Sequence, residues 1–294
     1  MTAPLLGPLR HPVHRFVLGD FEITTILDGT MQTGISPPFL IGKDDDEIAA
    51  IAHSANLPSD RLENNFVPTL VNTGKSLVLI DTGCGHFRRE TGAGFLLERL
   101  GDAGYGPEDV DVVVLTHVHP DHIGGLLEND KVAFPNAHLM IGRREFDAWK
   151  SGDDIPPQRA DNRQMFLDIV APLESQFRFL DDGDEVVPGI TAEAAFGHSL
   201  GHMMFRVRSA EEEVLIWGDV ANHYVFSLGH PAVTVGFDDN KPMAIETRER
   251  VLDMAARTGV LVVGHHMPFP SVGHVEKQDA GGYRWVPAAY ELRL

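Results

Sequence analysis

The segment LTHVHPDHIGG, residues 115–125, decides the fold and the chemistry of this chain. It crowds three imidazoles and a carboxylate into six positions, shortly after the apolar run 112–115. These residues are His117, His119, Asp121 and His122. Because residues i and i+2 of an extended chain point to the same side, His117 and His119 can reach one metal ion. Asp121 and His122 lie in the turn that follows and can reach a second ion beside it.

The alternative interpretation of this segment is a solvated, histidine-rich turn, since a lone histidine is more often structural than a ligand. Four ligand-type residues at the end of a buried strand are unusual for such a turn. Similar residues also recur after three later strands. They are His198 in FGHSLGH, Asp219 in VLIWGDV, and His265 and His266 in LVVGHHMPFP. Imidazole and carboxylate groups together suit zinc, iron, manganese and cobalt. The sequence therefore predicts a metal centre built from strand ends.

Composition narrows the class of protein. The chain has 294 residues, of which 43% are hydrophobic and 23% charged, so we expect one globular domain spanning residues 1–294. The net charge of −19 disfavours binding to nucleic acids or anionic membranes and favours neutral small-molecule substrates. The single cysteine, Cys84, permits no intrachain disulfide, and we find no signal peptide or membrane-spanning stretch. We expect a cytoplasmic protein, for which a homodimer is compatible with the sequence.

Hydrophobic periodicity predicts short strands interrupted by a few helices. We expect strands at 21–27, 111–117, 177–180, 190–195, 202–208, 213–217 and 259–266, and a hairpin at 69–83. We expect helices at 92–101, 143–150, 160–176 and 244–257, the last ending near Gly259. Residues 36–65 and 223–243 look like insertions, and long loops of this kind are often functional.

The order of these motifs resembles the metallo-β-lactamase superfamily from about residue 67 to residue 274. His-x-His-x-Asp-His is followed by Gly-His, by an Asp after a strand and by a late His, and LIDTG (79–83) resembles the family's early strand-end motif. The resemblance implies an α+β fold, an αββα sandwich of two mixed β-sheets flanked by helices. The segment HHMPFPSVGH resembles that of the methyl parathion hydrolase branch. Together with the region after Asp219, this resemblance implies a lactonase or an organophosphate triesterase.

Carried over residue by residue, the resemblance implies a dinuclear metal site. His117, His119 and His198 would hold the first ion, and Asp121, His122 and the late histidine the second. Asp219 would bridge the two ions, and Asp81 would orient ligands. The Met-Pro-Phe-Pro context selects His266 as the late ligand, whereas the simpler Gly-His pattern selects His265; we prefer His266. His202 is interpreted as a structural partner, because the first His of its motif normally binds.

Such a centre predicts hydrolysis. Two ions about 3.5–4 Å apart share a hydroxide that attacks a carbonyl carbon or a phosphorus, with Asp121 and Asp219 as the catalytic carboxylates. Zinc is the favoured metal, with manganese, cobalt and iron as alternatives. We expect the substrates to be N-acyl-homoserine lactones, related neutral esters or organophosphate triesters. A glyoxalase II-like thioesterase, a mono-iron persulfide dioxygenase and a non-catalytic metal-binding protein remain as alternatives.

The substrate pocket is predicted from side chains near the metal motifs. Candidates are Trp149, Phe196, His223, Tyr224 and Phe269, for each of which ordinary core packing is the alternative. Lys and Arg are absent from 111–130, 190–205 and 214–240. We therefore expect little positive charge around the centre, and weak activity on β-lactams, whose carboxylate normally needs a nearby cation.

Overall fold

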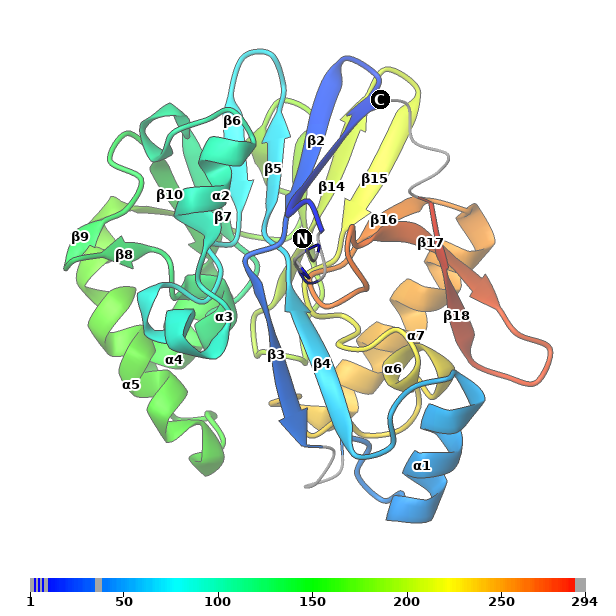
Figure 1. Cartoon of the computed structure of the whole chain (residues 1–294). Helices are drawn as coiled ribbons and strands as arrows, with labels where there is room; N and C mark the ends of the chain where they lie inside the picture. Colours follow the sequence, from blue (N-terminus) through cyan, green and yellow to red (C-terminus); the bar gives the residue numbers. More distant parts are fainter. Residues whose placement is uncertain (1–2, 4, 6, 8–9, 35–38, 289–294) are drawn as a thin grey trace.

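Two seven-stranded sheets face each other in the computed structural model of the chain, which describes residues 3, 5, 7, 10–34 and 39–288 (Figure 1). In spatial order the first sheet is β1 (Val13–Leu18), β2 (Phe21–Ile26), β5 (Thr69–Asn72), β6 (Leu77–Ile80), β7 (Val112–Leu115), β10 (His138–Gly142) and β11 (Phe177–Leu180). The second is β12 (Glu185–Val187), β13 (Ile190–Ala194), β14 (Met203–Ser209), β15 (Glu212–Ile216), β16 (Leu261–Val263), β17 (Val272–Lys277) and β18 (Tyr283–Pro287).

Both sheets are mixed. In the first, β1, β2, β5 and β6 pair antiparallel, and β6, β7, β10 and β11 pair parallel. In the second, only β15 and β16 pair parallel among the described strands. Two short ribbons lie outside the sheets: β3 (Gly29–Gly34) with β4 (Arg61–Phe66), and β8 (Leu127–Glu128) with β9 (Lys131–Val132).

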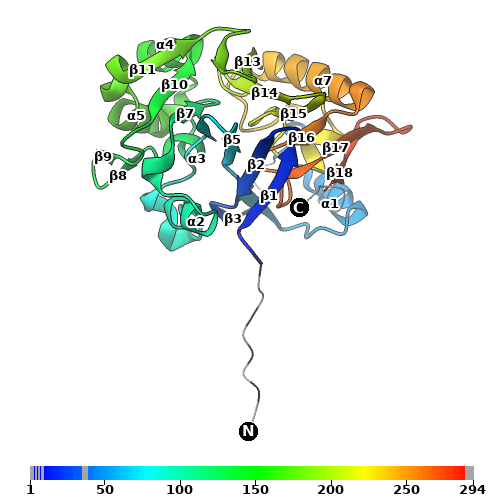
Figure 2. The same cartoon turned by 90° about the horizontal axis from the view of Figure 1, so that it is seen from above.

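Helices cover the outer faces of the sandwich, as the view from above shows (Figure 2). The α-helices are α1 (Asp45–Ser54), α2 (Leu96–Asp102), α3 (Pro120–Ile123), α4 (Arg143–Ser151), α5 (Ala160–Ile169), α6 (Phe226–Gly229) and α7 (Lys241–Thr258). Side chains of α2, α4 and α5 pack on the first sheet, and those of α7 pack on the second. The shorter 3-10 helices are η1 (His86–Thr91), η2 (Pro107–Asp109), η3 (Pro157–Arg159) and η4 (Ala171–Gln176). The predicted αββα sandwich is therefore confirmed.

Strand β7 shows how the sequence specifies these layers. Its four residues VVVL are all buried. Val112 and Val114 belong to the core between the two sheets, whereas Val113 and Leu115 belong to the core under α2, α4 and α5. Because side chains alternate along a strand, only a run that is apolar on both faces can sit in the middle layer of such a sandwich.

Several helices and strands begin or end at other residues than predicted, for reasons of backbone chemistry. The helix expected at 160–176 ends at Ile169 and continues as η4, because Pro172 removes a backbone donor and crowds the preceding turn. The helix expected from residue 92 begins at Leu96, since Gly92 and Gly94 have positive φ angles of 101° and 91°. The strand expected at 259–266 covers only 261–263, which places the two late histidines in the turn that follows.

The two expected insertions are more ordered than the sequence suggested. The first contains α1 and β4 and the second contains α6 and the start of α7. Residues 35–38 of the first lie outside the described residues. None of the helices in the described ranges is long and apolar enough to cross a membrane.

Candidate metal centre

The ligand-type residues meet at the edge where strands of both sheets end. His117 and His119 follow β7, His198 follows β13, Asp219 follows β15, and His265 and His266 follow β16. Asp121 and His122 lie on the short helix α3, directly after His119. Residues from four distant parts of the chain are thereby brought within a few ångströms of each other.

A first donor group consists of His117, His119 and His198, whose ligand atoms lie within 4.8 Å of one another. Nδ1 of His119 is 2.9 Å from Nε2 of His198. Nε2 of His117 is buried and has no hydrogen-bond partner in the described structure. Three buried imidazoles thus point ring nitrogens at one position.

A second donor group consists of Asp121, His122, His265 and His266. Oδ2 of Asp121 is 3.5 Å from Nε2 of His122 and 3.4 Å from Nε2 of His266. The ring of His265 lies against that of His122, with centroids 4.0 Å apart. Both late histidines are therefore near the cluster, but only for His266 is a carboxylate close to Nε2 among the described ion pairs.

Asp219 lies between the two groups. Its Oδ1 is 3.3 Å from Nε2 of His122. Its Oδ2 is 3.3 Å from Nε2 of His198 and 2.9 Å from Nε2 of His266. One carboxylate therefore faces imidazoles of both donor groups, which is the arrangement that a shared ligand requires.

The cluster fits a pair of divalent cations. Four of its buried polar atoms have no hydrogen-bond partner in the part of the chain that the structure describes. These are Nε2 of His117, His122 and His265, and Oδ1 of Asp219. Unpaired buried polar atoms are costly, and here they converge rather than scatter. Nitrogen and carboxylate donors in this number suit two divalent transition-metal ions.

Electrostatics prepares His117, His119 and Asp219 for cation binding. Burial lowers the pKa of His117, and it lowers the pKa of His119 to about 4, so both rings are neutral near pH 7. Burial alone would raise the pKa of Asp219, but the adjacent imidazoles of His266 and His122 bring that pKa well below its usual value. Neutral imidazoles and an ionised carboxylate are the forms that bind a metal ion. Burial alone would lower the pKa of His122 and His266, but the carboxylates beside them raise it, so metal binding at these two rings would displace a proton.

Two further residues hold the ligands in place. Oδ1 of Asp81 accepts the backbone N–H of Thr116 at 2.8 Å, and its Oδ2 lies 2.8 Å from Nδ1 of His122. Nε2 of His202 accepts the backbone N–H of Asp219 at 3.0 Å, while its Nδ1 lies 3.1 Å from the carbonyl oxygen of Ala195. Both ring nitrogens of His202 are thus occupied, which agrees with its interpretation as a structural partner.

Glu145 was missed by the sequence analysis. Its buried carboxylate accepts the N–H of Val118 at 3.0 Å, the hydroxyl of Ser199 at 2.5 Å and the N–H of Gly201 at 2.7 Å. It therefore ties the turn that carries His117 and His119 to the turn that carries His198. A signal was available, because an acidic residue four positions before Trp149 falls on the buried face of α4.

A cavity of about 550 Å³ opens onto the cluster. Its cluster residues are His119, Asp121, His198, Asp219 and His266. Its apolar wall is formed by Met31, Phe39, Phe66, Phe87, Met165 and Phe237. Phe39 and Phe237 come from the two segments that the sequence marked as insertions. Cys84 also lines the cavity, but burial raises the pKa of its thiol, so it offers no thiolate.

The five side chains predicted to line a substrate pocket are not found among the described residues that line this cavity. Trp149 is fully buried under the first sheet, and its Nε1–H donates to Ser199 at 2.9 Å. Tyr224 and His223 stack on each other with centroids 4.8 Å apart, and His223 is buried. Phe196 packs against the core between the sheets, and Phe269 is half-buried beyond the late histidines. Proximity in sequence to a ligand therefore did not identify the cavity wall.

Positive charge also lines this cavity, although the segments around the metal motifs contain no Lys or Arg. Arg88 of η1 and Arg159 of η3 line it, although both are distant in sequence from the metal motifs. Nε of Arg159 donates to Oδ1 of Asp239 at 2.7 Å, so its charge is paired. Arg88 is exposed.

A donor set of this kind at the edge of an αββα sandwich is that of a metal-dependent hydrolase. A family model described as the Metallo-beta-lactamase superfamily matches residues 68–265, which is more than half of the chain. The chain belongs to the metallo-beta-lactamase superfamily.

Two curated relatives are lactonases. An N-acyl homoserine lactonase of Bacillus cereus is 26% identical over 178 residues, which cover 60% of this chain and 61% of that protein. The N-acyl homoserine lactonase AttM of Azorhizobium caulinodans is 28% identical over 174 residues, which cover 56% of this chain and 61% of that protein. The aligned part of the chain thus spans 61% of the length of each relative.

Two solved structures match over nearly the whole chain. AidC, a dizinc quorum-quenching lactonase in complex with a product, N-hexanoyl-L-homoserine, has a TM-score of 0.87 and 26% identity, covering 94% of this chain and 97% of AidC. The hydrolase AbOPH of the beta lactamase superfamily has a TM-score of 0.86 and 27% identity, covering 95% and 98%.

Proposed function

We propose that this protein is a dinuclear metallo-hydrolase that opens lactones of the N-acyl-homoserine type and cleaves related neutral esters. Zinc is the proposed metal. The observation that carries the proposal is the position of Asp219, whose two carboxylate oxygens face Nε2 atoms of both donor groups at 2.9–3.3 Å. A single-metal protein would have no need for a carboxylate between two complete donor sets.

The proposed ligands divide between the two ions. His117, His119 and His198 hold the first, and Asp121, His122 and His266 the second, with Asp219 shared between them. We place His266 in the set because its Nδ1 lies 2.9 Å from the carbonyl oxygen of Asn65, while its Nε2 faces the cluster, 2.9 Å from Oδ2 of Asp219. A ligand imidazole normally has its other nitrogen fixed in this way.

The two bound cations would supply a water of lowered pKa and would polarise the substrate's carbonyl oxygen. The protein's own side chains position the two donor groups and move protons. Asp219, with a side chain only 3% exposed, holds the two donor groups at a fixed separation. Asp121 has a side chain 23% exposed and lines the cavity, so Oδ2 of Asp121 is placed to take a proton from the attacking water and to pass it to the leaving oxygen.

The cavity supports an acyl substrate. Six apolar side chains form its wall beside the cluster, and its volume of about 550 Å³ fits a lactone ring carrying an acyl chain. Two curated relatives and AidC are lactonases by name. We expect modest discrimination between acyl chains, because each methylene in an apolar pocket contributes about 1–3 kcal/mol.

A hydrolysis panel on protein loaded with Zn²⁺, Mn²⁺ or Co²⁺ tests the proposal. It should contain homoserine lactones of several chain lengths, neutral aryl esters, an aryl phosphotriester, nitrocefin and a glutathione thioester. Lactone opening is expected to be the fastest reaction. Efficient nitrocefin turnover without lactone opening, or a strict requirement for the thioester, would overturn it. A single iron with oxygen uptake on glutathione persulfide would assign the chain to the dioxygenases instead.

A further inference from the structure

Two consecutive aspartates lie directly behind the first donor group. Oδ1 of Asp238 is 3.1 Å from Nδ1 of His198, and Oδ2 of Asp239 is 3.0 Å from Nε2 of His119. The aspartate side chains are 0% and 1% exposed, respectively. Two buried carboxylates next to each other in sequence therefore each meet a different ligand-type histidine.

Each aspartate meets the ring nitrogen that points away from the cluster. Within the cluster, His119 presents Nδ1 and His198 presents Nε2, 2.9 Å apart. Asp239 and Asp238 lie at the opposite nitrogen of each ring. A carboxylate at one imidazole nitrogen holds the proton there and leaves the lone pair on the other. The two aspartates thus select opposite tautomers in two neighbouring rings.

An arginine holds each carboxylate from its far side. Nη2 of the buried Arg248 donates to Oδ2 of Asp238, and Nε of Arg159 donates to Oδ1 of Asp239. A buried carboxylate that is paired on both sides has its charge compensated and its rotamer fixed. The chains Arg248–Asp238–His198 and Arg159–Asp239–His119 are therefore rigid supports for the imidazoles.

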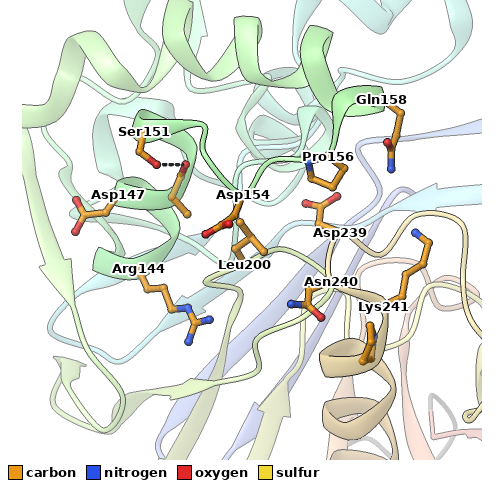
Figure 3. A pocket seen from close by; sticks show the side chains of 12 residues that line it. Arg144, Asp147, Ser151, Asp154, Pro156, Gln158, Leu200, Asp239, Asn240 and Lys241 are labelled. Atoms are coloured by element: carbon orange, nitrogen blue, oxygen red, sulfur yellow. Dashed lines mark hydrogen bonds between the residues drawn. The ribbon is translucent and has the colours of Figure 1, made fainter.

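The backbone fixes the same residues relative to the turn that carries His198. The N–H of Asp239 donates to the carbonyl oxygen of His198, and the N–H of Asn240 donates to that of Gly197, both at 2.9 Å. Asn240 is the N-cap of α7, and Figure 3 shows Asp239 beside Asn240 and Lys241 at the start of that helix. Asp239 lines a second, open cavity of about 980 Å³, whereas its partners His119 and Arg159 line the first.

We propose that Asp238 and Asp239 are positioning residues that set the tautomer and ring orientation of His198 and His119, and so act on the first metal ion alone. The inference rests on the proposed dinuclear function. The inference goes beyond that function because it predicts that substitution of either aspartate changes the affinity for the first metal ion and leaves that for the second unchanged.

The test is Co²⁺ titration of metal-free protein, followed by its visible absorption spectrum and by competition with a chelator. Asp239→Asn and Asp238→Asn keep the shape of the side chain. In each variant, however, the amide N–H₂ faces either the imidazole N–H or the arginine N–H, where the carboxylate accepted a hydrogen bond. Each variant is expected to lose about 10- to 100-fold in affinity at one of two Co²⁺ sites and to change the bands of that site only. Asp147→Asn is the matched control, because Asp147 lines the second cavity and has no hydrogen bond to an imidazole in the described structure.

The outcomes separate this inference from the proposed function. Two Co²⁺ sites in the wild type, with unchanged affinities and spectra in both variants, would overturn the inference alone. Equal weakening of both sites would overturn it as well. A wild type that binds no Co²⁺ would overturn the proposed function with it. If Asp238→Asn fails to fold because the buried Arg248 loses its opposite charge, Asp239→Asn, whose arginine reaches the cavity, decides alone.

Discussion

His265 and His266 are adjacent in sequence, but they present different atoms to the cluster. Nε2 of His266 lies 2.9 Å from Oδ2 of Asp219 and 3.4 Å from Oδ2 of Asp121, whereas no ion pair among the described residues brings a carboxylate to Nε2 of His265. We predict that the His266→Ala variant loses more than about 100-fold in metal affinity, which exceeds the loss of about 10- to 100-fold expected for a residue that only orients a ligand. The His265→Ala variant is expected to lose much less. Metal content and kcat/KM of the two variants provide the measurement. The reverse order would show that the Gly-His pattern identifies the ligand.

Asp219 carries the second residue-scale prediction. Asp219→Ala is expected to abolish hydrolysis and to lower the metal content, because two cations would then face each other without a shared anion. Hydrolysis assays and elemental analysis of the same preparation measure both effects. Wild-type activity in this variant would be incompatible with a dinuclear centre.

At the scale of residues, the sequence revealed groups that lie close together along the chain. His117, His119, Asp121 and His122 fall within one short segment, so their spacing alone predicts shared chemistry. Asp239 was not predictable in this way, because it meets His119 across 120 residues. The apolar cavity wall was missed for the same reason, since tertiary contacts leave no local pattern. Glu145 was missed although its place on the buried face of α4 is a local signal.

At the scale of elements, α4 connects two of the turns that carry ligands through Glu145. Glu145→Ala would leave three buried donors unpaired, from Val118, Ser199 and Gly201. Each unpaired donor costs about 1–3 kcal/mol, so we predict a loss of at least about 3 kcal/mol in the free energy of unfolding. Urea unfolding of the metal-free protein measures it.

Glu174→Ala is the control for that experiment. Glu174 of η4 pairs with Lys150 of α4, the helix that carries Glu145. Both side chains are about half exposed, so the loss of this pair is expected to cost less than about 1 kcal/mol in the free energy of unfolding. Equal effects of the two substitutions would show that Glu145 does not hold the turns together.

The elements themselves were predictable where local chemistry decides them. Gly259 ends α7 with a φ angle of 69°, as its position after the helical pattern suggested. Strands β17 and β18 were not predicted, because β17 alternates only partly and β18 is the edge strand of the second sheet. Their pairing depends on the neighbouring strand rather than on their own sequence.

At the scale of the whole molecule, the resemblance from about residue 67 to residue 274 agrees with the family match at 68–265. The extent of a single domain over residues 1–294 stays a prediction, as do the cytoplasmic location and the homodimer. The net charge of −19 should repel anionic substrates at long range.

We predict that salt distinguishes neutral from anionic substrates. Raising the ionic strength from about 0.01 M to about 0.15 M shortens the Debye length from about 30 Å to about 8 Å and so screens the repulsion of anions. The kcat/KM for an anionic succinate monoester should therefore rise, while that for the matched neutral acetate ester should stay constant. A fall for the anionic ester would indicate that Arg88 dominates its approach.

The central claim is a dinuclear centre, and the number of bound metal ions tests it most directly. Elemental analysis of protein purified without chelators should give close to two divalent ions per chain, with Zn²⁺ predominant. Prolonged dialysis against a chelator should remove both ions and the hydrolytic activity together, and adding Zn²⁺ back should restore both. A preparation that hydrolyses lactones at full rate with one ion per chain, or with none, would contradict the account.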